Sequence, residues 1–453
     1  MKRVLARGDG RSSFFQSAGV LGVSTTVGMA VPVLGMYAAG AVALVVGVAL
    51  VLQVPALGLM LLLPMVSILP PAPQAIGIGE ILFAALVLTT LASSFLLQGR
   101  ASRYFDHLQL SVMAVVGLML MSVIWGTAHG TQLDDWFRGI VPFMALLLII
   151  PGQRLLRVPR ADLFVIVSFY AAGLWAAFGT VSSGAAGLST AIDFDNALFI
   201  RTALSPEAYQ IPLLAPWAFA LGAVLLGNDR RPLHLAALAI FSGALALTLL
   251  RSVVVIAGGL IVLALIVLYL HRQRLRSLAT ALSLAVLGAV LTTSPGIVGL
   301  ITSGYASRFE VEGGGTAIRM DEFGAIAESV SASPVLGLGL GYTYSYYREG
   351  LGVTWVGAYT HNVLSYALLT MGAVGLLAVS VMLLLMTRRA WLALMDRSPM
   401  LSDVRYGLAF TMLAVIAYSM VQSSFRTLGF AVVLAICAIG LRRDDDHAEV
   451  APS

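Results

Sequence analysis

Apolar segments recur along this chain of 453 residues, and several approach or exceed the roughly 18 to 20 residues needed to cross a lipid bilayer. The clearest of them are residues 32–52, 78–97, 235–250, 253–270 and 362–385. Charged residues make up only 11% of the sequence, less than half of their roughly 25% share in soluble domains. So few charges cannot cover the surface of a soluble fold. The sequence therefore predicts an all-α, polytopic bundle of transmembrane helices that forms a single domain over residues 1–453.

The formal net charge of +5 does not indicate a nucleic-acid-binding protein. The arginines stand in short clusters between apolar runs and do not line one face of the chain. That pattern orients helices in a membrane, so we expect membrane lipids and no nucleic acid as partners. The single cysteine, Cys437, lies within an apolar run, which excludes a disulfide framework and a thiolate metal site.

Arginine-rich connections alternate with acidic or mixed ones, and short cytoplasmic loops are those that retain arginine. The predicted cytoplasmic connections carry Arg100, Arg103, Arg154, Arg157, Arg160, Arg230, Arg231, Arg272, Arg274, Arg276, Arg388, Arg389, Arg397, Arg442 and Arg443. This places the C-terminus in the cytoplasm and residues 302–360 outside the cytoplasmic membrane. We expect roughly 12 to 14 helices. The N-terminal orientation stays open. Residues 32–69 resemble a hairpin broken near residues 53–55, and either residues 15–29 also insert ahead of it or the hairpin is one span with a re-entrant piece.

The segment 302–360 is the one long polar excursion, and its Tyr, Trp, Leu and Val content argues against disorder. Its centre predicts a short amphipathic helix on which Arg319 and Glu322 are spaced to meet. The apolar stripe of this helix consists of Phe323, Ile326 and Val330. Pro334 ends the helix, and the alternating glycines that follow allow a tight turn and a close approach of the backbone to a ligand.

Four of the six histidines, His107, His234, His271 and His447, are predicted in cytoplasmic loops or the C-terminal tail. His361 and His129 are predicted on the outer side, and His361 is the more informative of the two. It opens a long apolar helix directly after the polar excursion. A half-polar ring in that place can simply anchor the helix at the membrane interface. Alternatively, a neutral imidazole can take a proton from a hydroxyl group at neutral pH, which makes His361 a candidate general base.

Arg251 stands between two apolar runs with almost no loop around it. A charge that close to hydrocarbon costs roughly 2.5 to 3.5 kcal/mol on insertion scales. Either snorkelling to the outer interface or binding of an anionic lipid group offsets this cost. The other arginines predicted outside are Arg201, Arg308, Arg319, Arg348 and Arg426, and solvated loop charges account for most of them.

Asp134 and Asp135 form an acidic pair after an early span, as a metal-dependent lipid-sugar transferase would require. An isolated acidic pair is common in loops, however, and Arg138 offers one of them an ion-pair partner. The sequence contains no nucleotide-type glycine loop, no His/Cys metal spacing and no Ser-His-Asp arrangement. We therefore expect neither a metal site nor a cofactor.

The order of these elements resembles the bacterial O-antigen ligase and O-antigen polymerase superfamily. The shared features are Arg319 before an amphipathic helix, the motif SPVLGLGLG, and a helix opened by His361 and Asn362 that continues to Gly-x-x-Gly-Leu. Arg251 and Ser252 resemble the family's Ser-Arg element at a span junction, although a leucine precedes the arginine here. The resemblance is strongest over residues 308–377.

The resemblance implies a metal-independent, inverting glycosyltransferase of the cytoplasmic membrane with its active site on the outer face. Such an enzyme transfers a glycan from undecaprenyl pyrophosphate to an acceptor hydroxyl of a glycan or lipid. Arg251 and Arg319, assisted by Arg201, would hold the pyrophosphate, since a guanidinium matches phosphate oxygens. His361 would accept the proton of the acceptor or orient its hydroxyl.

Other functions are compatible with parts of the sequence. A ligase and a polymerase differ only in their acceptor, and the sequence does not separate them. A transporter or flippase of lipid-linked oligosaccharide would require polar residues in mid-helix along a path, and most ionisable residues are placed at span ends. A structural scaffold would not explain why His and Arg gather on one side.

Overall fold

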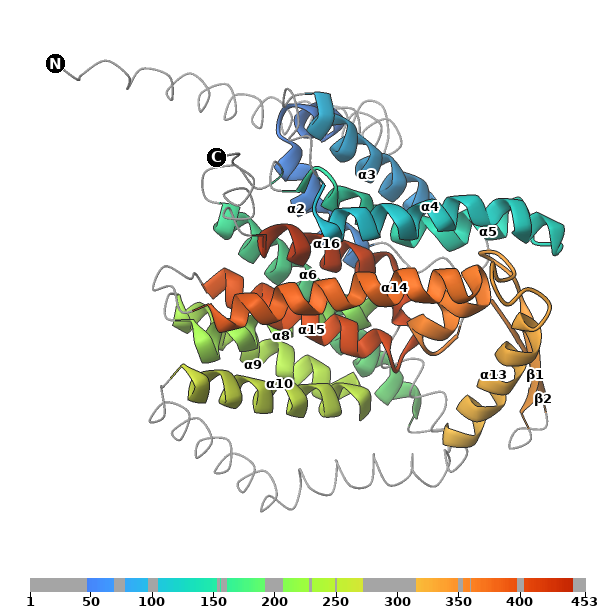
Figure 1. Ribbon diagram of the computed structural model, residues 1–453. Coiled ribbons are helices and arrows are strands. Elements are labelled where there is room, and N and C mark those ends of the chain that lie inside the picture. The colour runs from blue at the N-terminus through green and yellow to red at the C-terminus, as the bar shows by residue number, and fades with distance from the viewer. Residues whose placement is uncertain are drawn as a thin grey trace, which may run out of the picture.

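The structure is a computed structural model that describes residues 47–68, 78–96, 105–152, 155, 161–191, 207–227, 230–248, 251–271, 315–348, 353–358, 360–396 and 403–442. Its elements are α2 (Pro55–Ile68), α3 (Ile78–Leu96), α4 (His107–Ala128), α5 (Leu133–Ile140), η1 (Val141–Ile149), α6 (Ala161–Ala191), α8 (Glu207–Leu226), α9 (Arg231–Thr248), α10 (Arg251–Leu270), α13 (Gly315–Val330), β1 (Tyr344–Arg348), β2 (Val353–Gly357), α14 (Val363–Met395), α15 (Asp403–Ser419), η4 (Ser423–Arg426) and α16 (Leu428–Gly440). Figure 1 shows these helices as a bundle with α13 and the β1–β2 hairpin at one end, which we call the hairpin end.

Helices α8, α15 and α16 form the centre of the bundle. Every side chain of α8 from residue 211 to 224 is buried, as expected of a helix that is apolar on all sides. Outer helices instead leave large apolar side chains exposed, among them Leu110, Leu120, Met121 and Ile124 of α4. Exposed apolar surface of this kind is stable against lipid and costly in water.

Four helices among the described residues are long and apolar enough to cross a membrane: Gly79–Leu96, His107–Ala128, Ala161–Ser182 and Val363–Met395. Shorter apolar helices accompany them at Pro55–Ile68, Gln210–Leu226, Arg231–Leu245, Val255–Leu270 and Leu428–Gly440. The predicted all-α, polytopic membrane fold is thereby confirmed. The total of 12 to 14 helices and the single domain over 1–453 stay predictions, since residues 1–46 and 272–314 lie outside the described part.

The predicted span boundaries agree with the described helices. Helical residues 47–53 end at Val54 and α2 begins at Pro55, at the break expected near residues 53–55. The predicted run 78–97 is α3, and the runs on either side of Arg251 are α9 and α10. The run that follows His361 is α14, which continues to Met395.

The turn after α13 is inserted into a break in α14. Gly372 interrupts the helix with a φ of 63°. In an unbroken helix the carbonyls of Leu369 and Thr370 would accept from the amides four residues further on. Instead they accept from the N–H groups of Leu338 and Gly339, at 2.8 and 2.9 Å.

The amides beyond the break are satisfied in the same way. The N–H of Ala373 donates to the carbonyl of Pro334 at 2.9 Å, and the N–H of Val374 donates to that of Val335 at 3.3 Å. An unpaired backbone group at membrane depth costs several kcal/mol. The turn therefore supplies partners to the four helix groups that the break releases.

The glycines of this turn and of α14 bring backbone close to backbone. A Cβ added at Gly339 would lie 2.3 Å from the Cα of Gly126 on α4, and one added at Gly372 would lie 2.3 Å from the carbonyl oxygen of Val335. Both residues also have φ values that L side chains rarely adopt, 93° and 63°. The sequence suggested a close approach to a ligand here, whereas the described close approach is to helices of the same chain.

Helix α13 and the hairpin share a small apolar cluster. Ile326 and Val330 are buried as predicted, but Phe323 is 54% exposed, so the predicted three-residue stripe is wrong at that member. The cluster consists of Ile326, Val330, Leu338, Tyr344, Tyr346 and Leu369. The antiparallel register pairs Tyr344 with Gly357 and Tyr346 with Trp355. This hairpin was not predicted from the sequence.

Two of the arginines predicted in cytoplasmic connections lie together. Arg389 donates to Asp106 at 3.0 Å and to the carbonyl of Ala438 at 2.9 Å, while Arg442 lies 3.5 Å from the same carboxylate. Asp106 also caps α4 through a 2.7 Å bond from the amide of Gln109. This carboxylate joins α4, α14 and the end of α16, and its position agrees with the predicted grouping of these arginines on one side.

Because Gly339 lies against the backbone of α4, a methyl group added at this position should strongly lower the stability of the protein. We expect Gly339→Ala to destabilise the protein by more than about 2 kcal/mol, because backbone atoms cannot move aside and the positive φ is unfavourable for alanine. The measurement is the thermal unfolding midpoint in detergent. Gly117→Ala in α4 is the control, since its methyl group meets no atom within 4 Å. Equal midpoints for the two variants would contradict this account.

Candidate functional site

His361 immediately precedes α14, and Asn362 holds it there. Asn362 is the N-cap of the helix, and its Oδ1 accepts from the amides of Leu364 and Ser365 at 2.7 and 3.4 Å. Its Nδ2 donates to the carbonyl of Met420 at 3.1 Å. The predicted helix start at His-Asn is confirmed, and its physical cause is this cap.

The imidazole of His361 is bound to the carboxylate of Glu322 on α13. Nδ1 lies 2.6 Å from Oε2 of Glu322, and the backbone N–H of His361 donates to Oε1 at 3.1 Å. The hydroxyl of Tyr344 on β1 also donates to Oε1, at 2.7 Å. The Glu322 side chain is 5% exposed and that of His361 is 39% exposed. A buried carboxylate thus holds a ring that solvent can reach.

The environment of Glu322 favours its ionised form. Burial acts to raise the pKa of its carboxyl group, but the hydrogen bonds and the charge of His361 and the bond from Tyr344 outweigh burial, so the pKa is lowered below its ordinary value. Ionised Glu322 accepts hydrogen bonds and donates none. The proton between the two groups therefore belongs to Nδ1 of His361.

Arg319 lies three residues before Glu322 on the same helix, but the predicted contact between these two side chains is not made. Glu322 binds His361, and Nη2 of Arg319 donates to the carbonyl of Val421 at 3.2 Å. Arg319 is exposed. Its guanidinium is therefore held by a neutral acceptor at the surface of the hairpin end.

Three separate parts of the chain meet at residues 420–422, between α15 and η4. Asn362 binds the carbonyl of Met420, and Arg319 binds that of Val421. The Nε2 of Gln422 lies 3.4 Å from the hydroxyl of Ser252 in α10. The start of α10, helix α13 and the start of α14 are thus gathered around one short connection, which we call the 420–422 connection.

The structure brings together some of the residues predicted for the site. His361 and Arg319 both lie at the hairpin end, where His361 contacts Glu322 and Arg319 contacts the 420–422 connection. Arg251 is the first residue of α10 and neighbours Ser252, but its side chain is outside the described part. Arg201 lies wholly outside the described residues.

The acidic pair Asp134 and Asp135 begins α5. Asp135 lies 4.0 Å from Arg138, which confirms the ion pair predicted for one of these carboxylates. Among the described residues, no group of three His, Cys, Asp or Glu side chains is placed to hold a metal ion.

A second polar cluster lies inside the bundle. His234 was predicted in a cytoplasmic loop, but it is fully buried in α9. Its Nδ1 contacts the hydroxyl of Tyr170 on α6, and its Nε2 lies 3.2 Å from Asp403 at the start of α15. These two partners satisfy the hydrogen bonds of the buried imidazole. The neighbouring arginines indicated a cytoplasmic loop, and they carry no information about partners that are distant in the chain.

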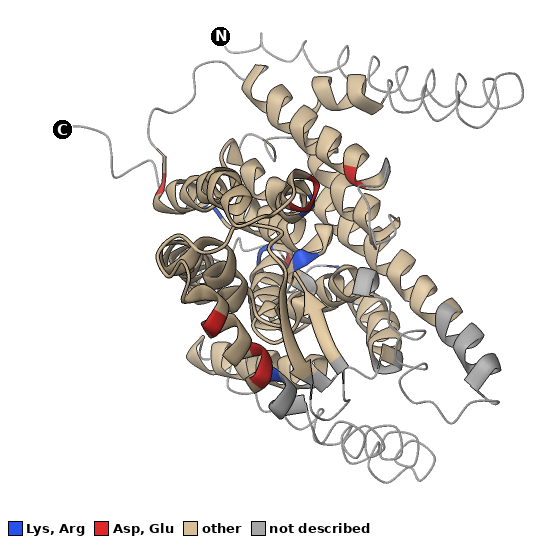
Figure 2. Cartoon of the chain, turned by 90° about the vertical axis from the view of Figure 1, so that its right-hand side faces the viewer, with Lys and Arg blue, Asp and Glu red and all other residues tan. Residues whose placement is uncertain are grey.

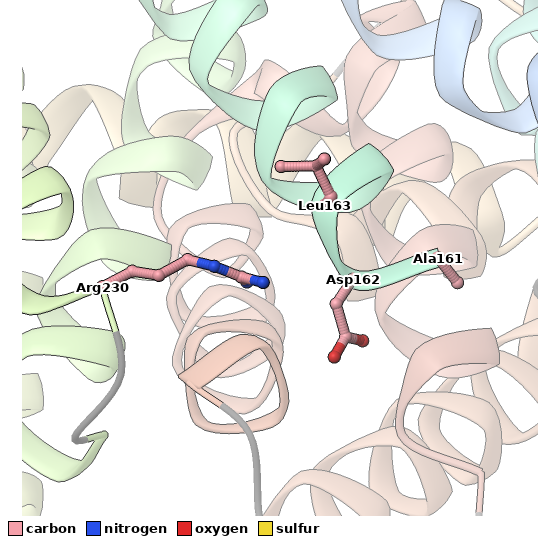
Figure 3. Close-up of a pocket in the computed structure, with 4 residues that line it drawn as sticks. All are labelled: Ala161, Asp162, Leu163 and Arg230. Atoms are coloured by element: carbon pink, nitrogen blue, oxygen red, sulfur yellow. The ribbon is translucent and has the colours of Figure 1, made fainter. Parts of the chain in front are cut away.

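A cavity of about 460 Å³ lies near this cluster and away from His361. Figure 3 shows its lining residues Ala161, Asp162 and Leu163 of α6 and Arg230 before α9. Helix α9 has 18 residues and is followed closely by α10, so its start lies about 27 Å from the end where Arg251 stands. We do not include this cavity in the candidate site.

Figure 2 views the protein from the hairpin end and shows acidic residues along α13 beside the hairpin. Arg319 is therefore a cation on a helix that also carries the acidic residues Asp321, Glu322 and Glu328.

Residues 236–380 match the family model described as O-antigen ligase. Over these residues the chain is similar to the O-antigen ligase family. This confirms the resemblance to the O-antigen ligase and polymerase superfamily, although the match covers less than half of the chain. No curated protein matches the sequence.

The matched region extends from α9 into α14 and contains Arg251, Arg319, Glu322 and His361. The match indicates a glycosyltransferase-like function of the ligase or polymerase type, in a multi-pass membrane protein of polysaccharide biosynthesis. The family implies a lipid-linked glycan donor and a polysaccharide acceptor. The 420–422 connection lies beyond the matched residues.

Sequence reasoning missed two side chains of this site. Glu322 was predicted to contact Arg319 because the two residues are three positions apart on one helix. Its actual partner, His361, is 39 residues away, and no periodic pattern in the sequence indicates a contact at that separation. Tyr344 was included in a glycine turn. The alternation of Tyr344, Ser345 and Tyr346 before a glycine-containing loop and a Val-Thr-Trp-Val run is a hairpin signal that could have found it.

The lowered pKa of Glu322 predicts a pH-dependent stability. A lowered carboxyl pKa stabilises the fold above the ordinary value of about 4.3, and this contribution disappears as the pH falls through the lowered value. We expect Glu322→Gln to destabilise the protein by about 2 kcal/mol near neutral pH, with the difference from wild type narrowing as the pH falls below the ordinary value of about 4.3.

The measurement compares the thermal unfolding midpoints of Glu322→Gln and wild type in detergent, from neutral pH to below about pH 4.3. Glu328→Gln is the matched control, because Glu328 is exposed on the same helix and should leave the midpoint close to wild type. A constant difference between Glu322→Gln and wild type at every pH would contradict the prediction.

Proposed function

We propose that this protein transfers a glycan from undecaprenyl pyrophosphate to an acceptor hydroxyl on the outer side of the cytoplasmic membrane. The observation that carries the proposal is the meeting of Arg319, the start of α10 and His361 around the 420–422 connection. A cation and a proton acceptor lie on neighbouring elements there. These are the groups that displacement of a diphosphate by an alcohol requires.

Binding of the diphosphate is assigned to arginines. Arg319 is exposed, and among the described residues one of its N–H groups donates to a neutral carbonyl, which leaves its other donors for phosphate oxygens. Arg251 begins α10, and its charge adds to the positive end of that helix dipole. Arg201 is proposed as a third contact on the sequence resemblance alone. Together these cations would stabilise the leaving group without a divalent metal.

His361 is proposed as the general base. Its Nδ1 is bound to Glu322 and its side chain is 39% exposed, so Nε2 would carry the lone pair that accepts the proton. The acceptor oxygen would form a bond to the anomeric carbon while the bond from that carbon to the pyrophosphate breaks. The hydroxyl proton passes to Nε2, and undecaprenyl pyrophosphate leaves. Attack from the face opposite the leaving group inverts the anomeric centre.

The proposal predicts loss of transfer without loss of folding. We expect His361→Ala to lower glycan transfer by about 100-fold or more, because it removes general base catalysis. Arg319→Ala should raise the KM for the lipid-linked donor by about 10-fold, because a charge-assisted bond to phosphate is lost. Purified protein is assayed with a lipid-pyrophosphate glycan donor in EDTA.

Arg138→Ala is the control variant, since Arg138 is a half-buried cation of α5 that lies 4.0 Å from Asp135 and is not one of the proposed diphosphate contacts. Full activity of His361→Ala would remove the assigned base. Loss of activity in EDTA, restored by a divalent ion, would favour Asp134 and Asp135 over the arginines as the diphosphate site.

Gene deletion distinguishes the two acceptor classes. Loss of long chains while single repeat units still reach the surface indicates a polymerase. Accumulation of lipid-linked polymer that never reaches its final acceptor indicates a ligase. Normal surface polysaccharide in the deletion strain would contradict both forms of the proposal.

A further inference from the structure

Tyr344, Glu322 and His361 form a continuous hydrogen-bonded chain from the hairpin to α14. The Tyr344 hydroxyl donates to Oε1 of Glu322 at 2.7 Å, and Oε2 accepts from Nδ1 of His361 at 2.6 Å. The chain therefore crosses three elements that are distant in sequence: β1, α13 and the start of α14.

The position of the Glu322 carboxylate is set from several directions. Its side chain is 5% exposed, and both of its oxygens accept hydrogen bonds. The backbone N–H of His361 adds a further bond to Oε1 at 3.1 Å. Rotation of the carboxylate would break at least one bond to each neighbouring element, so the direction of Oε2 toward the imidazole is fixed.

The Tyr344 ring is also held in place. It is buried and stacks on Tyr346 of the same strand, with ring centroids 6.0 Å apart and an interplanar angle of 10°. Both rings pack against Ile326 and Val330 of α13 in the apolar cluster. The hairpin that positions the Tyr344 hydroxyl therefore packs on α13, the same helix that carries Glu322.

We propose that Glu322 and Tyr344 are positioning residues for the base His361. This inference rests on the proposed function and adds two residues to it. Glu322 selects the tautomer with a proton on Nδ1 and a lone pair on Nε2, and Tyr344 keeps the carboxylate turned toward the ring. When Nε2 receives the acceptor's proton, the imidazolium lies beside the ionised carboxylate, which stabilises it. Glu322 itself takes up no proton.

A purely structural role of Glu322 would give different experimental results from a positioning role. A carboxylate that only ties α13 to α14 would change stability and leave the chemistry of Nε2 unaltered in the folded protein. A positioning carboxylate changes the reactivity of Nε2 even when the fold is intact. The test therefore measures this nitrogen directly as well as the transfer rate.

The first measurement is steady-state transfer by Glu322→Gln and Tyr344→Phe, each judged folded by its unfolding midpoint. We expect Glu322→Gln to lower kcat by about 100-fold and Tyr344→Phe by about 5-fold, with the donor KM within about 2-fold of wild type. The matched controls are Glu328→Gln on the same helix and Tyr346→Phe on the same strand, which should keep the wild-type kcat. A rise in KM with unchanged kcat would overturn the positioning role.

The second measurement is the rate at which diethyl pyrocarbonate modifies His361 in substrate-free protein, followed by peptide mass spectrometry. This reagent reacts with an unprotonated ring nitrogen. His129 is an internal reference, because it is exposed and its Nδ1 contacts the carbonyl of Trp125 at 2.6 Å in place of a carboxylate. The rate is measured at about pH 8, where an imidazole with an ordinary pKa of about 6.5 is unprotonated, so that the basicity and tautomer of Nε2 decide it. We expect Glu322→Gln to slow the modification of His361 relative to His129 by about 10-fold, because the ring loses the carboxylate that favours the lone pair on Nε2, and Tyr344→Phe to slow it less.

The two measurements fail separately. Absence of transfer by the wild-type protein would contradict the proposed function, while the modification rates would still decide whether Glu322 controls Nε2. Equal modification of His361 in wild type, Glu322→Gln and Tyr344→Phe would overturn the inference even if transfer is observed. If Glu322→Gln does not fold, Tyr344→Phe and Tyr346→Phe decide both measurements.

Discussion

The exchange of backbone hydrogen bonds between the glycine turn and α14 is the constraint on which the hairpin end depends. A helix inside a membrane cannot leave its carbonyls unpaired, so a break at Gly372 requires partners for Leu369 and Thr370. The turn provides them and is fixed by the same bonds. Because α13 precedes this turn and the hairpin follows it, both elements are held against the part of α14 between its N-cap Asn362 and Gly372.

This arrangement explains how a short polar segment can be ordered at the edge of a lipid-facing bundle. The hairpin has two strands, and an isolated hairpin is marginally stable in water. Here Tyr344 and Tyr346 pack on Ile326 and Val330, and the Tyr344 hydroxyl is bound to Glu322. Side-chain packing and one buried carboxylate thus replace the larger core that a soluble domain would need.

The sequence predicted the parts of the fold that depend on local patterns. Apolar run length predicted the spans, and the His-Asn pair predicted the start of α14, because both signals lie within a few residues. Arg319 and His361 were found by their residue types and by a family resemblance. The partner of His361 could not be found in this way, since Glu322 also has a plausible partner one helical turn away. The burial of His234 was missed because Tyr170 and Asp403, which satisfy it, are distant in the chain.

The bonds between the turn and α14 are matched residue by residue, and this has a consequence for chain length. Leu338 and Gly339 face Leu369 and Thr370, while Pro334 and Val335 face Ala373 and Val374. One inserted or deleted residue in either segment would shift every one of these pairs at once. Among natural homologues we therefore expect the spacing from Pro334 to Gly341 to be invariant, whereas insertions should accumulate in the loop that joins β1 to β2.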